Sequence, residues 1–240
     1  MLDYACKNKF PSIYETGFNM TGQHIPEYSG TLRGHMIEIP LPINECGGIR
    51  IFGRLIKSLV FSTDIAIIRN INADAVIAVY PFTPQPIISH ALIMASDIPV
   101  FCGVGGGTTT GTRVVHLASD AEFQGAVGVV LNAPTLNTTI KRVRDVIDIP
   151  IVITVVNEND DIIGRLESGA SILNVSAAAR TPWLIEQIRK VHPEIAIMAT
   201  GGPNDQSIKD TINAGANAIT WTPPTTAEIF KGMMDNYRQR

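Results

Sequence analysis

Short apolar runs rich in β-branched residues recur from about residue 57 to the end of the chain. They do not alternate with polar residues, which is typical of parallel strands buried on both faces. The runs predict eight strands, at about 58–62, 75–80, 98–103, 126–131, 149–156, 170–175, 194–199 and 216–221. A stretch with helical spacing of apolar residues follows each run, and these stretches predict helices at about 64–72, 85–95, 112–123, 136–147, 160–168, 182–191, 204–213 and 226–237.

Two kinds of turn precede the strands in alternation. One kind holds small residues, as in 214–216, and the other holds an acidic residue and a proline, as in 97–99. Strands that follow the first kind of turn begin 44 to 51 residues apart, at Ala75, Ala126, Ala170 and Ala216. A repeat of two strand–helix units fills one such period. Eight units are the number of a closed (β/α)8 TIM barrel, whereas five or six would favour the alternative, an open doubly wound sheet. We therefore predict an α/β chain with a TIM barrel.

The predicted domains are an N-terminal extension, residues 1–56, and the barrel, residues 57–240. The extension holds strand-like pieces at 36–39 and 49–51. It can close the bottom of the barrel, or it can lie as an arm on a partner subunit or over the barrel mouth. Because its apolar pieces have no place in an eight-unit barrel, we expect a homo-oligomer.

Composition excludes several classes of partner. The 240 residues are 45% hydrophobic and 17% charged, with a formal net charge of −3. A chain without a basic patch is not expected to bind nucleic acid or a membrane surface. Three cysteines (Cys6, Cys46 and Cys102) without framework spacing indicate free thiols in a reducing compartment. With no signal sequence and no membrane-spanning apolar run, the chain is predicted to be cytoplasmic.

In a TIM barrel the site lies at the C-terminal ends of the strands. Asp64 and Glu158 are the carboxylates nearest to predicted strand ends, so they are candidates for general acid and base, and Asn174 ends the sixth strand. Asp64 can instead cap the first helix. Asp160 and Asp161 can join a divalent-metal site or cap the fifth helix. Neither the spacing of histidines and cysteines nor any cofactor motif predicts a metal or a cofactor.

The loop from Gly103 to Arg113 is the most unusual segment of the chain. Its glycines, with Gly105, Gly106 and Gly107 at the centre, let backbone amides approach an anion, and a helix follows directly. The spacing matches neither a P-loop, which needs a lysine here, nor a dinucleotide-binding fingerprint. We expect the loop to contact an anionic ligand, with Arg113 making a bidentate contact. A plain loop, with Arg113 paired to an acid on its own helix, is the alternative.

Three segments near the end of the chain, 199–203, 214–220 and 225–229, carry a family resemblance. They read ATGGP, AGANAIT and TTAEI, and they resemble the end of the ribulose-phosphate-binding barrels, such as N-acetylmannosamine-6-phosphate epimerase and 2-keto-3-deoxy-6-phosphogluconate aldolase. The resemblance implies a phosphate held by Gly201, Gly202, Thr222 and the start of the last helix. This chain departs from the family in having prolines at 223 and 224, which lack an amide hydrogen, and in having no lysine for a Schiff base on the sixth strand.

The barrel and the resemblance together predict an enzyme that acts on a small phosphorylated or otherwise anionic metabolite by lyase or isomerase chemistry. The first alternative is a hydrolase in which Asp64 or Glu158 activates water. The second is a non-catalytic barrel that binds a metabolite or serves in an assembly.

Overall fold

The computed structural model describes residues 24, 26 and 36–239, so Cys6 lies outside the described residues. The chain forms two compact units, one of residues 37–223 and the other of residues 1–36 and 224–240. In the second unit, helix α8 (Thr226–Arg238) begins at a capping box. The Thr225 hydroxyl accepts from the Glu228 amide, and the Glu228 carboxylate accepts from the Thr225 amide.

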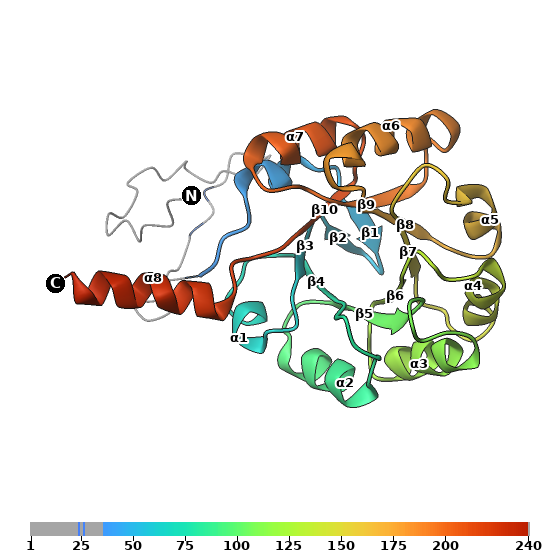
Figure 1. The fold of residues 1–240 in the computed structure, drawn as a ribbon, viewed down its shortest axis with the longest axis horizontal. Helices are drawn as coiled ribbons and strands as arrows, with labels where there is room; N and C mark the ends of the chain where they lie inside the picture. Colours follow the sequence, from blue (N-terminus) through green and yellow to red (C-terminus); the bar gives the residue numbers. More distant parts are fainter. Residues whose placement is uncertain (1–23, 25, 27–35, 240) are drawn as a thin grey trace. The chain divides into compact units, whose positions relative to one another are not determined.

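Eight parallel strands of the first unit close into a barrel (Figure 1). The strands are β3 (Ser58–Phe61), β4 (Ala75–Ala78), β5 (Val100–Gly105), β6 (Gly128–Leu131), β7 (Ile151–Val155), β8 (Ile172–Val175), β9 (Ala196–Thr200) and β10 (Ala218–Trp221). Neighbours in sequence are neighbours in the barrel, and β10 pairs with β3 to complete the ring. The α/β class and the TIM barrel predicted from the sequence are confirmed, and each observed strand overlaps a predicted one.

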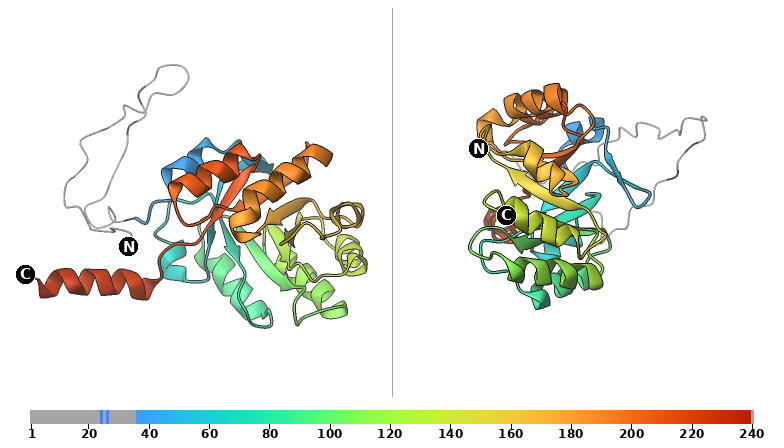
Figure 2. Two further views of the ribbon diagram at one scale, coloured as in Figure 1. Left: turned by 45° about the horizontal axis from the view of Figure 1, so that its top comes forward. Right: turned by 90° about the vertical axis from the view of Figure 1, so that its right-hand side faces the viewer.

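Helices of the same unit lie outside the ring of strands (Figures 1 and 2). They are α1 (Ile65–Ile68), α2 (Pro86–Ala95), α3 (Thr112–Phe123), α4 (Asn137–Arg144), α5 (Ile162–Glu167), α6 (Thr181–Val191) and α7 (Asp205–Asn213), with short 3₁₀ helices η1 (Leu41–Glu45) and η2 (Ala178–Arg180). Their starts follow ordinary capping chemistry: Asn204 and Ser207 form a capping box on α7, and proline stands in the first turn of α2 and α6.

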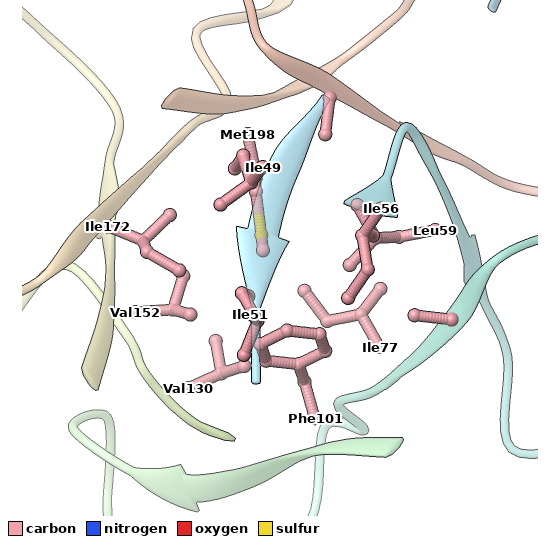
Figure 3. Close-up of a cluster of buried hydrophobic side chains, with 12 residues drawn as sticks. Ile49, Ile51, Ile56, Leu59, Ile77, Phe101, Val130, Val152, Ile172 and Met198 are labelled. Atoms are coloured by element: carbon pink, nitrogen blue, oxygen red, sulfur yellow. The ribbon is translucent and has the colours of Figure 1, made fainter. Parts of the chain in front are cut away.

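An antiparallel hairpin from the predicted extension fills the lower end of the barrel. Strands β1 (Ile49–Ile51) and β2 (Arg54–Ile56) pair with each other. Ile49, Ile51 and Ile56 belong to the same buried cluster as side chains from the starts of the barrel strands (Figure 3). The Gly48 amide also donates to the Asn217 carbonyl oxygen, 2.8 Å away, at the entry to β10. Residues 37–56 therefore belong to the barrel unit and close its bottom.

The inward-facing side chains are stacked in layers. In an eight-stranded barrel with a shear of eight, the strands are tilted, so residues paired through the register do not lie at the same height. From any residue, the member of its layer two strands further on is found by following the register across both strands and then moving two residues toward the C-terminal end. With the observed register, the layers from bottom to top hold four sets of inward residues. They are Ala75, Gly128, Ile172 and Ala218; then Leu59, Phe101, Val152 and Met198; then Ile77, Val130, Asn174 and Thr220; and at the mouth Phe61, Gly103, Thr154 and Thr200.

A large side chain in one layer packs against a small residue in the next. Phe101 is fully buried at the centre of the barrel, and Gly128 lies beside it in the layer below. A methyl group added at Gly128 would stand 2.6 Å from the Phe101 ring, so the glycine is what makes room for the phenyl group. The two lower layers are wholly apolar, and polar side chains enter only above Phe101.

Three sequence expectations are corrected. The predicted strand-like piece at 36–39 is a single bridge, because Ile37 pairs only with Ile71 and the chain then reaches Pro40. The predicted helix at 64–72 ends at Ile68, and the Asn70 carbonyl accepts from the Ile37 amide instead of continuing the helix. The third predicted strand, 98–103, is shifted, because β5 runs to Gly105 through a register irregularity between Gly103 and Gly105.

Candidate functional site

A cavity of about 240 Å³ lies at the C-terminal ends of β4, β5 and β6. In the described part of the chain its lining carries no carboxylate, ammonium or guanidinium group. It is lined by Val79, Tyr80, Pro81, Phe82, Pro84, Gly103, Gly105, Gly107, Thr108, Thr109 and Asn132. The cavity therefore has an aromatic side from the loop after β4 and a polar side from backbone, hydroxyl and amide groups. This is the end of the barrel at which TIM-barrel sites are found.

The glycine loop turns back on itself because Gly105 and Gly106 adopt backbone angles that L side chains rarely adopt, with φ of 131° and 101°. The Gly106 amide donates to the Thr109 carbonyl oxygen at 2.9 Å and closes the turn. Residues 107–109 consequently face the cavity. A side chain at Gly106 would collide with the Thr135 hydroxyl and the backbone of Asn132. A methyl group at Gly107 would have as its nearest atom the side-chain nitrogen of Asn132, 3.8 Å away.

The loop after β6 holds the glycine loop in place. The Asn132 amide donates to the Gly105 carbonyl oxygen at 2.9 Å, and the Thr135 amide and hydroxyl both donate to the Asn132 carbonyl oxygen. These bonds fix a tight turn between β6 and α4, and the turn places the Asn132 side chain at the edge of the cavity. Two consecutive loops thus form one rigid polar edge.

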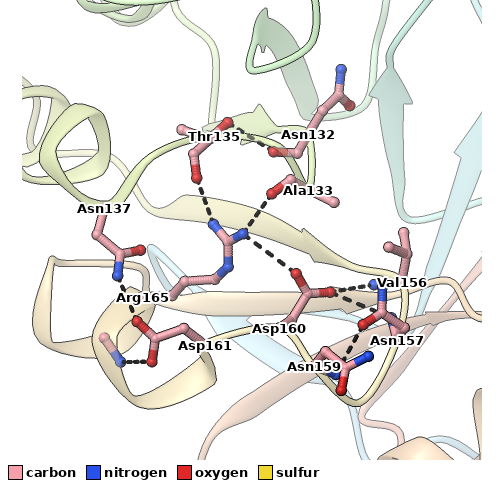
Figure 4. A network of polar contacts seen from close by, with 11 residues as sticks. Asn132, Ala133, Thr135, Asn137, Val156, Asn157, Asn159, Asp160, Asp161 and Arg165 are labelled. Atoms are coloured by element: carbon pink, nitrogen blue, oxygen red, sulfur yellow. Dashed lines mark hydrogen bonds and ion pairs between the residues drawn. The ribbon is translucent and has the colours of Figure 1, made fainter.

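Arg165 of α5 anchors that edge from behind (Figure 4). Only 7% of the residue is exposed, and its guanidinium donates to the carbonyl oxygens of Thr135 and Ala133. It also forms an ion pair with Asp160, at 3.4 Å. Asp160 in turn accepts hydrogen bonds from the amides of Val156 and Asn157, after β7. This role could not be predicted from the sequence, because an arginine inside a short amphipathic helix normally lies at the surface.

The predicted carboxylates lie apart from this cavity. Asp64 caps α1 by accepting from the amides of Ala66 and Ile67. Glu158 is exposed and pairs with Arg180 at 3.0 Å. Hydrogen bonding by its own backbone amide, and then by Arg180, holds the pKa of Glu158 below its ordinary value. Asp161 caps α5 through the Gly164 amide, as the capping alternative predicts.

The described residues include no group of three or more histidines, cysteines or carboxylates that could hold a metal ion. Asp160 uses both oxygens in the bonds described above, and the second oxygen of Asp161 accepts from the Asn137 side-chain amide at 2.8 Å. Cys102 is buried on β5, and desolvation raises the pKa of its thiol to about 11, which disfavours the nucleophilic thiolate. Among the described residues, the carboxylates at this end of the barrel therefore do not converge on a divalent-cation site.

The residues nominated by the family resemblance lie elsewhere around the mouth. Gly201 and Gly202 follow β9, and Thr222 follows β10. Gly201 packs against Ile208 and Ile219, where a methyl group would stand 2.9 and 2.7 Å from their side chains. The first turn of α7 beyond them is closed by its own capping box and contains Asp205, which opposes an anion at that helix end. None of the three lines the cavity described above.

Arg113 and Asn174 occupy different environments. Arg113 is exposed in the first turn of α3, and the acids expected as its alternative partners are bonded elsewhere: Glu122 accepts from the amides of Asp148 and Ile149, and Asp120 accepts from Gln124. Asn174 is buried in the third layer of the barrel interior. Among the site residues predicted from the sequence, the cavity brings together Gly105 and Gly107, with Gly106 directly behind them.

Comparison with solved structures places the fold among TIM barrels. A protein named as a phosphonomutase of Burkholderia cenocepacia J2315 superposes with a TM-score of 0.61 at 17% identity, over 80% of this chain and 96% of that one. Phosphoenolpyruvate phosphomutase of Streptomyces platensis subsp. rosaceus gives 0.56 at 11% identity, over 82% and 83%. A phosphonopyruvate hydrolase in complex with oxalate and Mg++ gives 0.55 at 11% identity, over 78% and 93%.

No protein-family profile matches the chain, and no curated protein does. At these identities the superpositions show a shared (β/α)8 fold. The resemblance to the ribulose-phosphate-binding barrels stays a prediction, since the reported neighbours are barrels of other names. Within the described residues, no helix has the length and apolarity needed to cross a membrane.

We predict that Arg165→Met lowers the free energy of unfolding by about 2–4 kcal/mol, because it leaves the Thr135 and Ala133 carbonyls and Asp160 without their buried donor. Urea unfolding measures the change. Arg54→Met, at an exposed position of β2, is the matched control and should change stability by less than about 0.5 kcal/mol. Equal losses in the two variants would show that the anchor contributes nothing specific.

Proposed function

We propose that this chain is an enzyme acting on a small phosphorylated or otherwise anionic metabolite at the C-terminal mouth of the barrel, by lyase or isomerase chemistry. The observation that carries the proposal is the cavity lined by the glycine loop without any carboxylate. An anion entering it meets backbone, hydroxyl and amide groups, and among the described residues no negative side chain lines it.

Two further features favour the glycine loop as the anion-binding end. It leads directly into α3, whose first turn has no acidic residue, so the positive end of the helix dipole is unopposed there. Arg113 stands in the same turn, exposed to solvent. We assign the anionic group of the substrate to Gly105, Gly106 and Gly107, with Arg113 as its charged contact. A second candidate position for the anionic group, separate from the first, is formed by Gly201, Gly202 and Thr222.

The neighbours' names suggest which anions to try. They include phosphoenolpyruvate and phosphonopyruvate, both small acids that carry a phosphorus group. The hydrolase was solved with Mg++, but the described carboxylates of this chain do not converge on a metal site, so no step is assigned to a metal. A hydrolase using Asp64 and Glu158 finds no support in the cavity, because neither residue lines it.

Tyr80 is the ionisable side chain among the residues that line the cavity. Its hydroxyl accepts a hydrogen bond from the Gln85 amide at 2.9 Å, which fixes the phenol at the start of α2. A phenol held in this way can give or take a proton at a substrate bound beside it. We assign Tyr80 as the proton-transferring group of the reaction.

Gly107→Ala tests the anion-binding assignment. The added methyl group has room in the fold, with its nearest neighbour at 3.8 Å, but it faces the cavity. We expect unchanged unfolding without ligand, and affinity for phosphoenolpyruvate or inorganic phosphate weaker by about tenfold, or about 1.4 kcal/mol. Thermal shift against ligand concentration gives both quantities.

Gly47→Ala is the matched control, since a methyl group at Gly47 meets nothing within 4 Å. Its affinity should equal that of the unaltered chain. The anion-binding assignment fails if Gly107→Ala binds the same anions as tightly as the control does. Binding without any turnover by either protein would favour the non-catalytic alternative.

Tyr80→Phe tests the catalytic assignment, with turnover of phosphonopyruvate and phosphoenolpyruvate followed by phosphorus NMR. Loss of a general acid or base slows the reaction by roughly 10²–10⁴-fold. Because the ring stays, ligand affinity should change by less than about threefold. A variant that keeps full activity would remove Tyr80 from the chemistry.

A further inference from the structure

The third layer of the barrel interior holds two buried oxygen atoms that have no hydrogen-bond partner. Asn174 and Thr220 are only 9% and 6% exposed. Within the described chain, neither Asn174 Oδ1 nor Thr220 Oγ1 has a partner. Each such group costs stability, about 1–3 kcal/mol when it is fully desolvated. Two of them in one layer call for a physical reason.

Both side chains point toward the barrel axis. Asn174 is two residues beyond Ile172 on β8, and Thr220 is two residues beyond Ala218 on β10, so each pair lies on the same face of its strand. Ile172 and Ala218 belong to the apolar cluster inside the barrel. The register places Asn174 and Thr220 in one layer, two strands apart, with Ile77 and Val130 completing it. The unpartnered atoms therefore share one side of the barrel interior.

The cavity lies at the same end of the barrel, above the β4–β6 side of this layer. Two of its lining residues, Val79 and Asn132, stand two positions beyond Ile77 and Val130, just past the ends of β4 and β6. A third, Gly103, belongs to the mouth layer. Above Asn174 and Thr220 the inward residues are Thr154, Ser176 and Thr200, and the Thr200 hydroxyl donates to the Ser176 hydroxyl at 3.1 Å. The inward-facing side chains at the ends of β7, β8 and β9 are thus hydroxyl groups.

We infer that Asn174 and Thr220 form a subsite for the hydroxyl groups of the ligand. A ligand hydroxyl can donate to Asn174 Oδ1, and another can accept from or donate to Thr220 Oγ1, so binding satisfies both atoms. The inference rests on the proposed function for the place of the anion, and it narrows the substrate class to hydroxylated, polyol-like anions. It also makes Asn174 a binding residue instead of a catalytic one.

The test uses two phosphate esters with the same carbon chain. Glycerol 3-phosphate carries two hydroxyl groups that n-propyl phosphate lacks, and both present the same anion to the glycine loop. Wild-type protein should bind glycerol 3-phosphate about five- to tenfold more tightly, the value of a neutral hydrogen bond. Thr220→Val, and separately Asn174→Leu, should each reduce that difference, and the double variant should abolish it, with the affinity for n-propyl phosphate unchanged.

A stability readout separates this role from a structural one. Because the Thr220 hydroxyl is unpartnered, Thr220→Val should leave the unfolding midpoint unchanged or raise it. Thr211→Val is the matched control: Thr211 is as buried, but its hydroxyl donates to the Ser207 carbonyl oxygen at 2.8 Å, so this variant should unfold more easily. A Thr220→Val variant that is destabilised as much as Thr211→Val would overturn the inference.

The binding outcomes distinguish this inference from the proposed function. Equal binding of both esters, unaffected by Thr220→Val, overturns the hydroxyl subsite and leaves the anion site standing. If neither ester binds, the neutral polyol erythritol decides: stabilisation of the wild type and not of Thr220→Val supports the subsite without the anion site. No stabilisation by any of the three compounds overturns both.

Discussion

Closure of the barrel is the constraint on which the rest of this structure depends. Each strand is buried on both faces, so its inward side chains must fill a space shared by all eight. The fully apolar layer of Leu59, Phe101, Val152 and Met198 does this at mid-height, and the β1–β2 hairpin completes the packing from below. Because the lower half is filled with apolar groups, ligand chemistry is confined to the upper end.

The glycine loop is an extension of that frame. The register irregularity between Gly103 and Gly105 lets β5 run further than its neighbours, and the two glycines with positive φ then turn the chain back over the mouth. Arg165 stabilises the loop after β6, on which the glycine loop rests, through hydrogen bonds to two of its carbonyl oxygens. Arg189 does the same at the lower end, where it donates to the carbonyl oxygens of Gly215, Pro193 and Ile195, and burial lowers its pKa from the ordinary value. Guanidinium groups with several donors suit this task, since one side chain can serve several backbone carbonyls.

The sequence predicts the barrel well because the burial of parallel strands leaves a local signal, a short β-branched run every two dozen residues or so. It also identifies the glycine loop, because glycine in such number has a conformational reason. It does not predict the extension of β5, which depends on pairing with β6. It places Asp64 and Glu158 at strand ends but cannot show that one caps a helix and the other pairs with Arg180. The role proposed for Asn174 and Thr220 depends on their lying in one layer, which only the strand register shows. The role of Arg165 depends on contacts with a loop about 30 residues away in the sequence.

The proposed function depends on the glycine loop binding the anionic group of the ligand. Titration of ¹⁵N-labelled protein with inorganic phosphate, followed by amide chemical shifts, tests it most directly. If the loop binds the anion, saturable shifts are expected at Gly105, Gly107, Thr108 and Thr109, the part of the loop that lines the cavity. Shifts confined to Gly201, Gly202 and Thr222, with the glycine loop unchanged, would contradict it.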